Sequence, residues 1–241
     1  YQVSSTPVVA DLDLDCVPEI IFNTYAGSAF TSNGVIRAIR GDTGEKVWTV
    51  TDPAYETDST ANPAVGDIDS DGRAEVVVQG EGKYLIAFDS DGTPLWKSDP
   101  FTGARSSGSI SVANFDNEGD PEIVFGAAVY DSSGKLLYEG KSGIGRNGQG
   151  PISCIADLDL DGNPEVAVIA NAGQQLPHHL LVWRYDADQP NGVEVVRGGI
   201  DINGPLSPGL CPNGSAGNTR GGGPPTIADF NGDGTPDVAI T

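Results

Sequence analysis

The sequence of 241 residues lacks methionine altogether, and it contains only three cysteines, two histidines and 13 basic residues, against 34 acidic ones. Three cysteines are too few for a disulfide scaffold. The formal net charge of −21 disfavours binding to nucleic acid and to anionic membrane surfaces, because both require clustered Lys and Arg. No apolar run approaches the ~18 residues of a membrane-spanning helix, so we expect no direct membrane insertion. Because the chain begins with Tyr1, we expect a processed mature protein or part of a longer one.

Helical periodicity is also missing, whereas 33 glycines and 17 prolines indicate many turns. Instead, five nine-residue segments share one acidic pattern. They read DLDLDCVPE, DIDSDGRAE, NFDNEGDPE, DLDLDGNPE and DFNGDGTPD, and they begin at Asp11, Asp67, Asn114, Asp157 and Asp229. Their starts are 56, 47, 43 and 72 residues apart, a loose period typical of propeller blades.

Each segment is preceded by a short apolar run and followed by a β-rich run such as VVV or VAVI. Hairpin patterns come next, for example YLIAFDSDGTPLWKS, in which two apolar stretches flank a turn of Asp, Ser and Gly. Each unit therefore predicts a strand, an acidic loop, a second strand and a hairpin. The fold class is all-β.

A four-stranded unit cannot bury both faces alone, so repeated units must stack, and radial stacking gives a β-propeller. The predicted blades span residues 4–52, 61–99, 108–141 and 150–198, with a partial fifth at 224–241. Because propellers close to protect their edges, we expect one domain that belongs to a ring of roughly six to eight blades. A five-bladed ring with a half-finished blade is the alternative.

The acidic segments have the composition of calcium loops. Oxygen-bearing side chains fall at positions 1, 3, 5 and 9, glycine at position 6 permits a sharp turn, and the carbonyl of residue 7 can add another oxygen. Zinc would require His or Cys, and magnesium would take fewer carboxylates. An EF-hand would need flanking helices and a Glu at position 12. The alternative is that the loops are empty, solvated Asp-rich turns.

Up to five calcium ions are predicted, and the candidate ligands follow loop by loop. They are Asp11, Asp13, Asp15, Glu19 and the Val17 carbonyl; Asp67, Asp69, Asp71, Glu75 and the Arg73 carbonyl; Asn114, Asp116, Glu118, Asp120 and Glu122; Asp157, Asp159, Asp161, Glu165 and the Asn163 carbonyl; and Asp229, Asn231, Asp233, Asp237 and the Thr235 carbonyl. The third loop is the weakest, because Asn114 and Glu118 replace two aspartates. In the first loop Cys16 replaces the glycine, so we expect a strained turn there.

These segments, above all DIDSDGRAEVVV, DLDLDGNPEVAVI and DFNGDGTPDVAI, resemble the FG-GAP or VCBS-type repeats of integrin-α-like β-propellers. The resemblance spans nearly the whole chain. It implies a secreted or surface-exposed propeller in which calcium links the first and second strands of each blade. It further implies adhesion, ligand recognition or an accessory role in carbohydrate-active or toxin-like proteins.

Other motifs have plainer explanations. Arg40-Gly41-Asp42 spells an integrin-binding tripeptide, but Asp42 falls at the place of Asp89, Asp131 and Asp186 in the other hairpins, which indicates turn chemistry. The adjacent His178 and His179 would point to opposite faces of a strand, which makes them poor joint ligands. Trp48, Trp96 and Tyr138 recur in the fourth strands and are expected to pack between blades, whereas Trp183 breaks that register.

Three longer insertions, at residues 23–33, 171–180 and 199–223, are candidates for a ligand surface. The last contains Cys211 and an Asn213 glycosylation sequon, and a bridge from Cys211 to Cys154 would hold it, although Cys154 is equally expected as a buried free thiol.

We therefore expect an extracellular, calcium-binding propeller that acts as a binding or adhesion module for protein or glycan and is not an enzyme. The alternatives are a calcium-dependent polysaccharide lyase or other carbohydrate-active enzyme, and a structural spacer. Further blades or domains of a parent protein are possible partners. The five segments hold 19 of the 34 acidic residues and one basic residue, Arg73, so most of the net charge lies in the predicted cation sites.

Overall fold

The computed structural model describes residues 1–27, 33–102, 108–115, 117–140, 152–169, 179–189, 192–201 and 225–240. Within these ranges the chain forms antiparallel sheets, and its helical content is a single 3-10 turn, η1 (Pro53–Tyr55). No helix in the described ranges is long and apolar enough to cross a membrane. The predicted all-β class is confirmed.

Four sheets follow one another along the chain, and in each the strands lie side by side in sequence order. The first sheet has a short fifth strand that pairs with its third. The strands are β1 (Val8–Ala10), β2 (Glu19–Tyr25), β3 (Asn33–Arg40), β4 (Lys46–Thr49) and β5 (Thr57–Asp58); β6 (Ala64–Gly66), β7 (Glu75–Gln79), β8 (Leu85–Phe88) and β9 (Pro94–Lys97); β10 (Ile110–Ala113), β11 (Glu122–Phe125), β12 (Ala128–Tyr130) and β13 (Leu136–Glu139); and β14 (Ser153–Ala156), β15 (Glu165–Ile169), β16 (His179–Tyr185) and β17 (Val193–Asp201). A fifth, two-stranded sheet holds β18 (Thr226–Ala228) and β19 (Asp237–Ala239).

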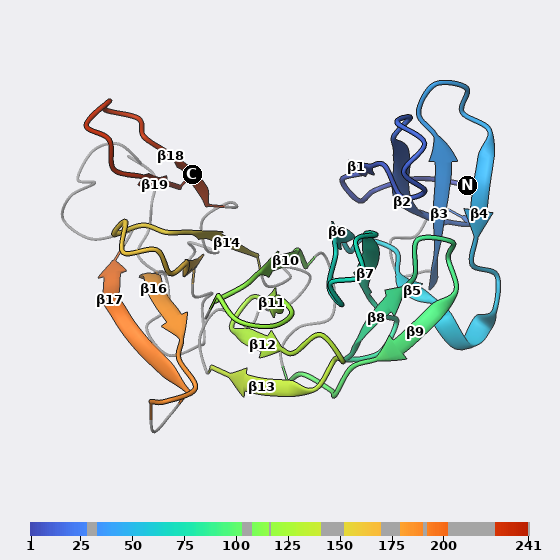
Figure 1. The fold of residues 1–241 in the computed structure, drawn as a ribbon. Coiled ribbons are helices and arrows are strands. Elements are labelled where there is room, and N and C mark those ends of the chain that lie inside the picture. Colours follow the sequence, from blue (N-terminus) through green and yellow to red (C-terminus); the bar gives the residue numbers. More distant parts are fainter. Residues whose placement is uncertain are drawn as a thin grey trace, which may run out of the picture.

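The sheets are arranged along an arc (Figure 1). The first strands β1, β6, β10, β14 and β18 lie on its concave side, and the fourth strands β4, β9, β13 and β17 lie on its convex side. Successive first strands contact one another. The described sheets do not form a closed ring, so the number of blades stays a prediction.

The core lies between neighbouring sheets, because the second strands are buried on both faces. In β7, Val76 and Val78 pack with residues of the first sheet, whereas Val77 packs with residues of the third. In β11, Ile123 faces the second sheet, and Val124 belongs to the cluster shared with the fourth. This two-sided burial explains the uninterrupted apolar runs after each acidic segment, and full burial of one such side chain contributes about 1.5–3 kcal/mol.

The aromatic residues of the fourth strands connect each sheet to the next. Trp48 Nε1 donates to the Ser90 carbonyl and Trp96 Nε1 donates to the Ser132 carbonyl, both at 2.9 Å. Tyr138 packs against Trp183, with ring centroids 5.8 Å apart. The aromatics thus pack between sheets as expected, and Trp183 is a core residue, 6% exposed.

Candidate metal centres

The five acidic segments lie between the first and second strands of their sheets, and the same hydrogen bond closes each of them. The backbone N–H of the second residue donates to a carboxylate oxygen of the ninth. The N···O distances range from 2.8 to 3.1 Å, for Leu12–Glu19, Ile68–Glu75, Phe115–Glu122, Leu158–Glu165 and Phe230–Asp237. The ninth carboxylate is thereby held at the start of its loop.

The first aspartate organises the turn in four of the loops. Its two carboxylate oxygens accept hydrogen bonds from the backbone N–H groups of the fifth and sixth residues, at 2.9–3.1 Å, in the loops that begin at Asp11, Asp67, Asp157 and Asp229. The fifth aspartate then accepts from the N–H of residue 7, namely Val17, Arg73, Asn163 or Thr235, at 2.8–2.9 Å. The carbonyl oxygens of these four residues stay predicted ligands.

This turn requires left-handed backbone at its sixth residue. Gly72 and Gly162 have φ values of 89° and 97°, and Cys16 has a φ of 69° in the equivalent place. A residue with a side chain costs about 1–2 kcal/mol in this conformation. The strain expected at Cys16 from the sequence therefore has a structural basis.

Three groups of carboxylates converge. Within each group one oxygen per residue lies within 4.8 Å of the others, and the groups are Asp11–Asp13–Asp15, Asp67–Asp69–Asp71 and Asp157–Asp159–Glu165. The predicted sets are brought together in part, because Glu19, Glu75 and Asp161 fall outside these groups. In the fifth loop the described acidic residues do not form such a group.

The third loop departs from this pattern, as its sequence indicates. Asn114 Nδ2 donates to the carbonyls of Glu118 and Gly119, at 3.4 and 3.3 Å, where an aspartate would accept. Asp120 accepts a hydrogen bond from the Ser132 hydroxyl at 3.2 Å. Asp116 lies outside the described residues, so a metal site in this loop stays a prediction.

The ninth residue of these loops places a carboxylate group in the protein interior. Glu19, Glu75 and Glu165 are at most 1% exposed. The pKa of Glu75 is raised from 4.5 to about 7, chiefly by burial and also by the charges of Asp69, Asp71 and Asp67. Burial likewise raises the pKa of Glu165. Removing a carboxylate from water is costly unless a cation or hydrogen-bond donors compensate.

The donor set fits a hard divalent cation in the first loop. Oε1 of Glu19 is buried and has no hydrogen-bond partner, while its other oxygen is bound by Leu12 N–H. Three other carboxylates of the same loop, those of Asp11, Asp13 and Asp15, converge with one another. An all-oxygen, mostly carboxylate set with an unsatisfied buried acceptor matches the ligands that calcium takes.

Two arginines reach into the acidic loops, and sequence analysis did not find them. Arg40, at the end of β3, donates from Nη1 to Asp15 Oδ2 at 2.7 Å. Arg184, near the end of β16, donates from Nη1 to Asp161 Oδ2 at 2.6 Å. These guanidinium groups lower the pKa of Asp15 and of Asp161. Their position in the sequence could have indicated this contact. Both arginines lie near the end of the third strand of their sheet, opposite the ninth residue of the acidic loop.

The Arg40-Gly41-Asp42 tripeptide forms hydrogen bonds within its own hairpin and with the first acidic loop. Arg40 binds Asp42 Oδ1 at 3.1 Å as well as Asp15, and Gly41 N–H donates to the Pro18 carbonyl at 2.9 Å. The expected equivalence of Asp42 with Asp89 and Asp131 is wrong. The backbone N–H groups of Asp89 and Asp131 donate across their hairpin turns to the carbonyls of Thr93 and Lys135, and in the first hairpin the N–H of Arg40 donates in the same way to the Glu45 carbonyl. Arg40, not Asp42, therefore occupies that place.

The remaining candidates are only partly described. Cys16 and Cys154 are free thiols, and Cys154 Sγ donates to the Pro225 carbonyl at 2.6 Å. Cys211, Asn213 and His178 lie outside the described residues, as do residues 28–32, 171–178 and 202–223 of the three predicted insertions. The first insertion was predicted to begin too early, because residues 23–25 belong to β2. His179 begins β16.

Neither a protein-family model nor a curated protein matches the chain. Solved structures do resemble it. The V. cholerae biofilm matrix protein Bap1 matches with 24% identity and a TM-score of 0.63, over 99% of this chain and 35% of that one. The rhamnogalacturonan lyase YesW matches with 18% identity and a TM-score of 0.60, over 98% of this chain and 43% of that one.

A third match, BBS1N in complex with ARL6DN, has 11% identity and a TM-score of 0.54, over 84% of this chain and 58% of that one. The chain thus spans less than two thirds of each of these proteins. At such identities the likeness establishes a common fold, shared by a matrix protein, a lyase and a protein–protein complex.

Proposed function

We propose that the chain is part of a calcium-stabilised β-propeller of the FG-GAP or VCBS type, which acts outside the cell as a binding or adhesion module for protein or glycan. The repetition of one four-stranded unit along an arc supports the propeller (Figure 1). First strands on the concave side and fourth strands on the convex side are what radial stacking of blades requires.

Calcium would be held by the converging carboxylates of the first, second and fourth loops. When bound, it supplies positive charge that offsets the mutual repulsion of three or four carboxylates. The chain's own residues do the rest: the first aspartate fixes the turn, and the buried ninth residue anchors the loop to the second strand. Metal binding is thereby coupled to the stability of the fold.

The observation that carries this proposal is the buried Glu19 Oε1, which has no hydrogen-bond partner and belongs to a loop in which Asp11, Asp13 and Asp15 converge. A solvated, empty turn would not place a carboxylate oxygen out of water without a donor.

A binding role is supported by the separation of the apolar cores from the loops that join the strands. The sheets pack through apolar cores, and loops between the elements of such a scaffold commonly carry binding residues. Bap1, a biofilm matrix protein, is compatible with an extracellular module of this kind.

A carbohydrate-active enzyme is the second candidate, and the likeness to the rhamnogalacturonan lyase YesW favours it. It would require basic or tyrosine side chains converging on a uronate-binding cleft. A structural spacer is the third candidate. Turnover of acidic polysaccharides would establish the enzyme, whereas glycan and protein arrays without any hit would favour the spacer.

Chelation tests the metal. We expect purified protein to contain calcium by elemental analysis, and a calcium chelator to lower the melting temperature by several degrees. At this chain length about 1 kcal/mol corresponds to roughly 2–4 °C. If purified protein contains no calcium and the chelator leaves the melting temperature unchanged, the loops are only turns.

A further inference from the structure

The residue that faces the ninth loop position from the third strand differs between sheets. In the first sheet Glu19 pairs directly with Arg40. In the fourth sheet Val166 pairs with Trp183, which places Glu165 opposite Arg184.

The same place is acidic in the middle sheets. Val76 pairs with Phe88 in the second sheet, which places Glu75 opposite Asp89. Ile123 pairs with Tyr130 in the third, which places Glu122 opposite Asp131. A cation therefore stands at one edge of the acidic loop in the outer sheets, and an anion stands there in the inner ones.

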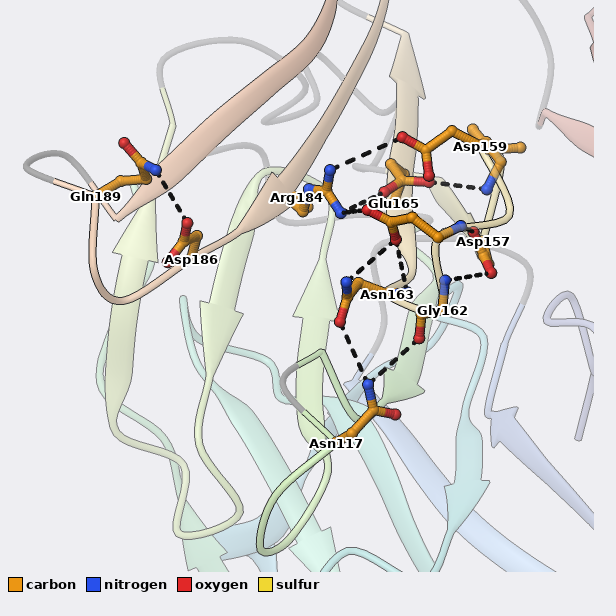
Figure 2. Close-up of polar contacts among 11 residues, drawn as sticks. Asn117, Asp157, Asp159, Gly162, Asn163, Glu165, Arg184, Asp186 and Gln189 are labelled. Atoms are coloured by element: carbon orange, nitrogen blue, oxygen red, sulfur yellow. Dashed lines mark hydrogen bonds and ion pairs between the residues drawn. The ribbon is translucent and has the colours of Figure 1, made fainter.

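Arg184 lies among the candidate ligands of its loop (Figure 2). Its Nη1 is 2.6 Å from Asp161 Oδ2 and 3.5 Å from Glu165 Oε1, and its Nη2 is 3.8 Å from Asp159 Oδ2. Three of the four predicted side-chain ligands of the fourth loop thus contact one guanidinium group.

Arg40 engages its loop less completely. It contacts one candidate ligand, Asp15, through Nη1, and its Nε forms an ion pair with Asp42 of its own hairpin. In the second loop, by contrast, no ion pair reaches Asp67, Asp69, Asp71 or Glu75 from any residue that the structure describes.

A guanidinium and a divalent cation that share the same carboxylates exclude one another by repulsion and by competition for the same oxygens. The guanidinium is covalently attached, so it is always present, whereas calcium must be taken from solution. A loop whose carboxylates contact an arginine is therefore partly neutralised without metal and gains less from binding it.

We propose that Arg40 and Arg184 divide the acidic loops into two classes, an inference that rests on the proposed calcium binding. The second loop binds calcium most tightly, the first loop binds it more weakly because of Arg40, and the fourth loop binds it most weakly because Arg184 holds three of its ligands. The two arginines serve as internal counter-ions, so part of the molecule keeps its loop geometry when calcium is scarce.

Calcium titration of chelator-treated protein by calorimetry tests this assignment. As single substitutions, Asp71→Asn in the second loop should abolish a tight site, whereas Asp161→Asn in the fourth loop should leave the tight sites in place. In R184Q the fourth loop should bind calcium about tenfold more tightly, as expected for loss of an interaction equal to one pKa unit. R184Q should also melt at a lower temperature than wild type when calcium is absent. R40Q, in a different sheet, repeats the test if R184Q does not fold.

Arg37→Gln is the matched control. Arg37 also lies in β3, but it donates to the hydroxyls of Thr24 and Thr49 and forms no ion pair with a loop carboxylate that the structure describes. It loses the same charge and should leave calcium affinity unchanged. Unchanged affinity in both R184Q and R40Q, or loss of a tight site in D161N, would overturn the assignment. A wild-type protein that binds no calcium at all would instead overturn the proposed function.

Discussion

At the scale of the residue, Glu75 is a carboxylate that the fold buries beside other negative charges. Its side chain is 1% exposed, and its carboxylate accepts the Ile68 N–H at 2.8 Å. Burial, together with the charges of three aspartates of the same loop, raises its pKa to about 7. Glu75→Gln keeps an oxygen that can accept this hydrogen bond but removes the buried charge. Without metal, the variant should melt at a higher temperature than wild type; with calcium, it should melt at a lower one. Thermal melting in chelator and in calcium checks both signs, and E45Q, at an exposed hairpin residue, should show neither.

The pH dependence follows from the same group. The folded pKa of Glu75 is raised from 4.5 to about 7, so between these values the folded state binds a proton that the unfolded state has lost. The contribution of Glu75 to metal-free stability is therefore greatest at the acid end of this window and declines as pH rises through it. Melting of metal-free wild-type and E75Q proteins from pH 5 to 8 should show a steeper decline in the wild type. Parallel profiles would contradict the assignment.

At the scale of the element, the hairpin between the third and fourth strands of a sheet packs against an aromatic side chain of the preceding sheet. Gly92, in the hairpin that joins β8 and β9, has a φ of 83°, and a Cβ there would lie 2.8 Å from the Trp48 ring. Gly44, in the first hairpin, has a φ of 71° and nothing within 4 Å of such an atom. Both alanine variants should lose about 1–2 kcal/mol of stability to backbone strain. Gly92→Ala should lose a further ~1–3 kcal/mol to overpacking, which urea denaturation would measure. Equal losses would show that the tryptophan moves aside freely.

At the scale of the whole molecule, the net charge of −21 is concentrated in five loops rather than spread over the surface. Without calcium these loops repel within themselves, and salt reduces the repulsion because the screening length falls from about 30 Å at 0.01 M to roughly 8 Å at 0.15 M. Added KCl should therefore raise the melting temperature of the chelator-treated protein more than that of the calcium-loaded protein. An equal response in both states would mean that the loop charges are already compensated.

The amino-acid sequence by itself determined the strand order and the loops. Apolar runs such as VVV alternate with Asp-rich turns at a repeated spacing, and hairpin chemistry at Asp89–Gly92 or Asp131–Gly134 is local, so these elements could be predicted without tertiary information. The special place of the sixth loop residue was also predictable, since its left-handed φ is a property of the turn.

Only the tertiary structure decided which charges meet. Asp161 and Arg184 are 23 residues apart, and whether they touch depends on the register of β15 and β16 and on the rotamers of both side chains. The burial of Glu19 and Glu75 likewise arises from packing between sheets, which turns an acidic residue of an exposed motif into a buried carboxylate. Local pattern fixes where the acidic residues stand along the chain, whereas pairing across strands sets the electrostatic environment of each one.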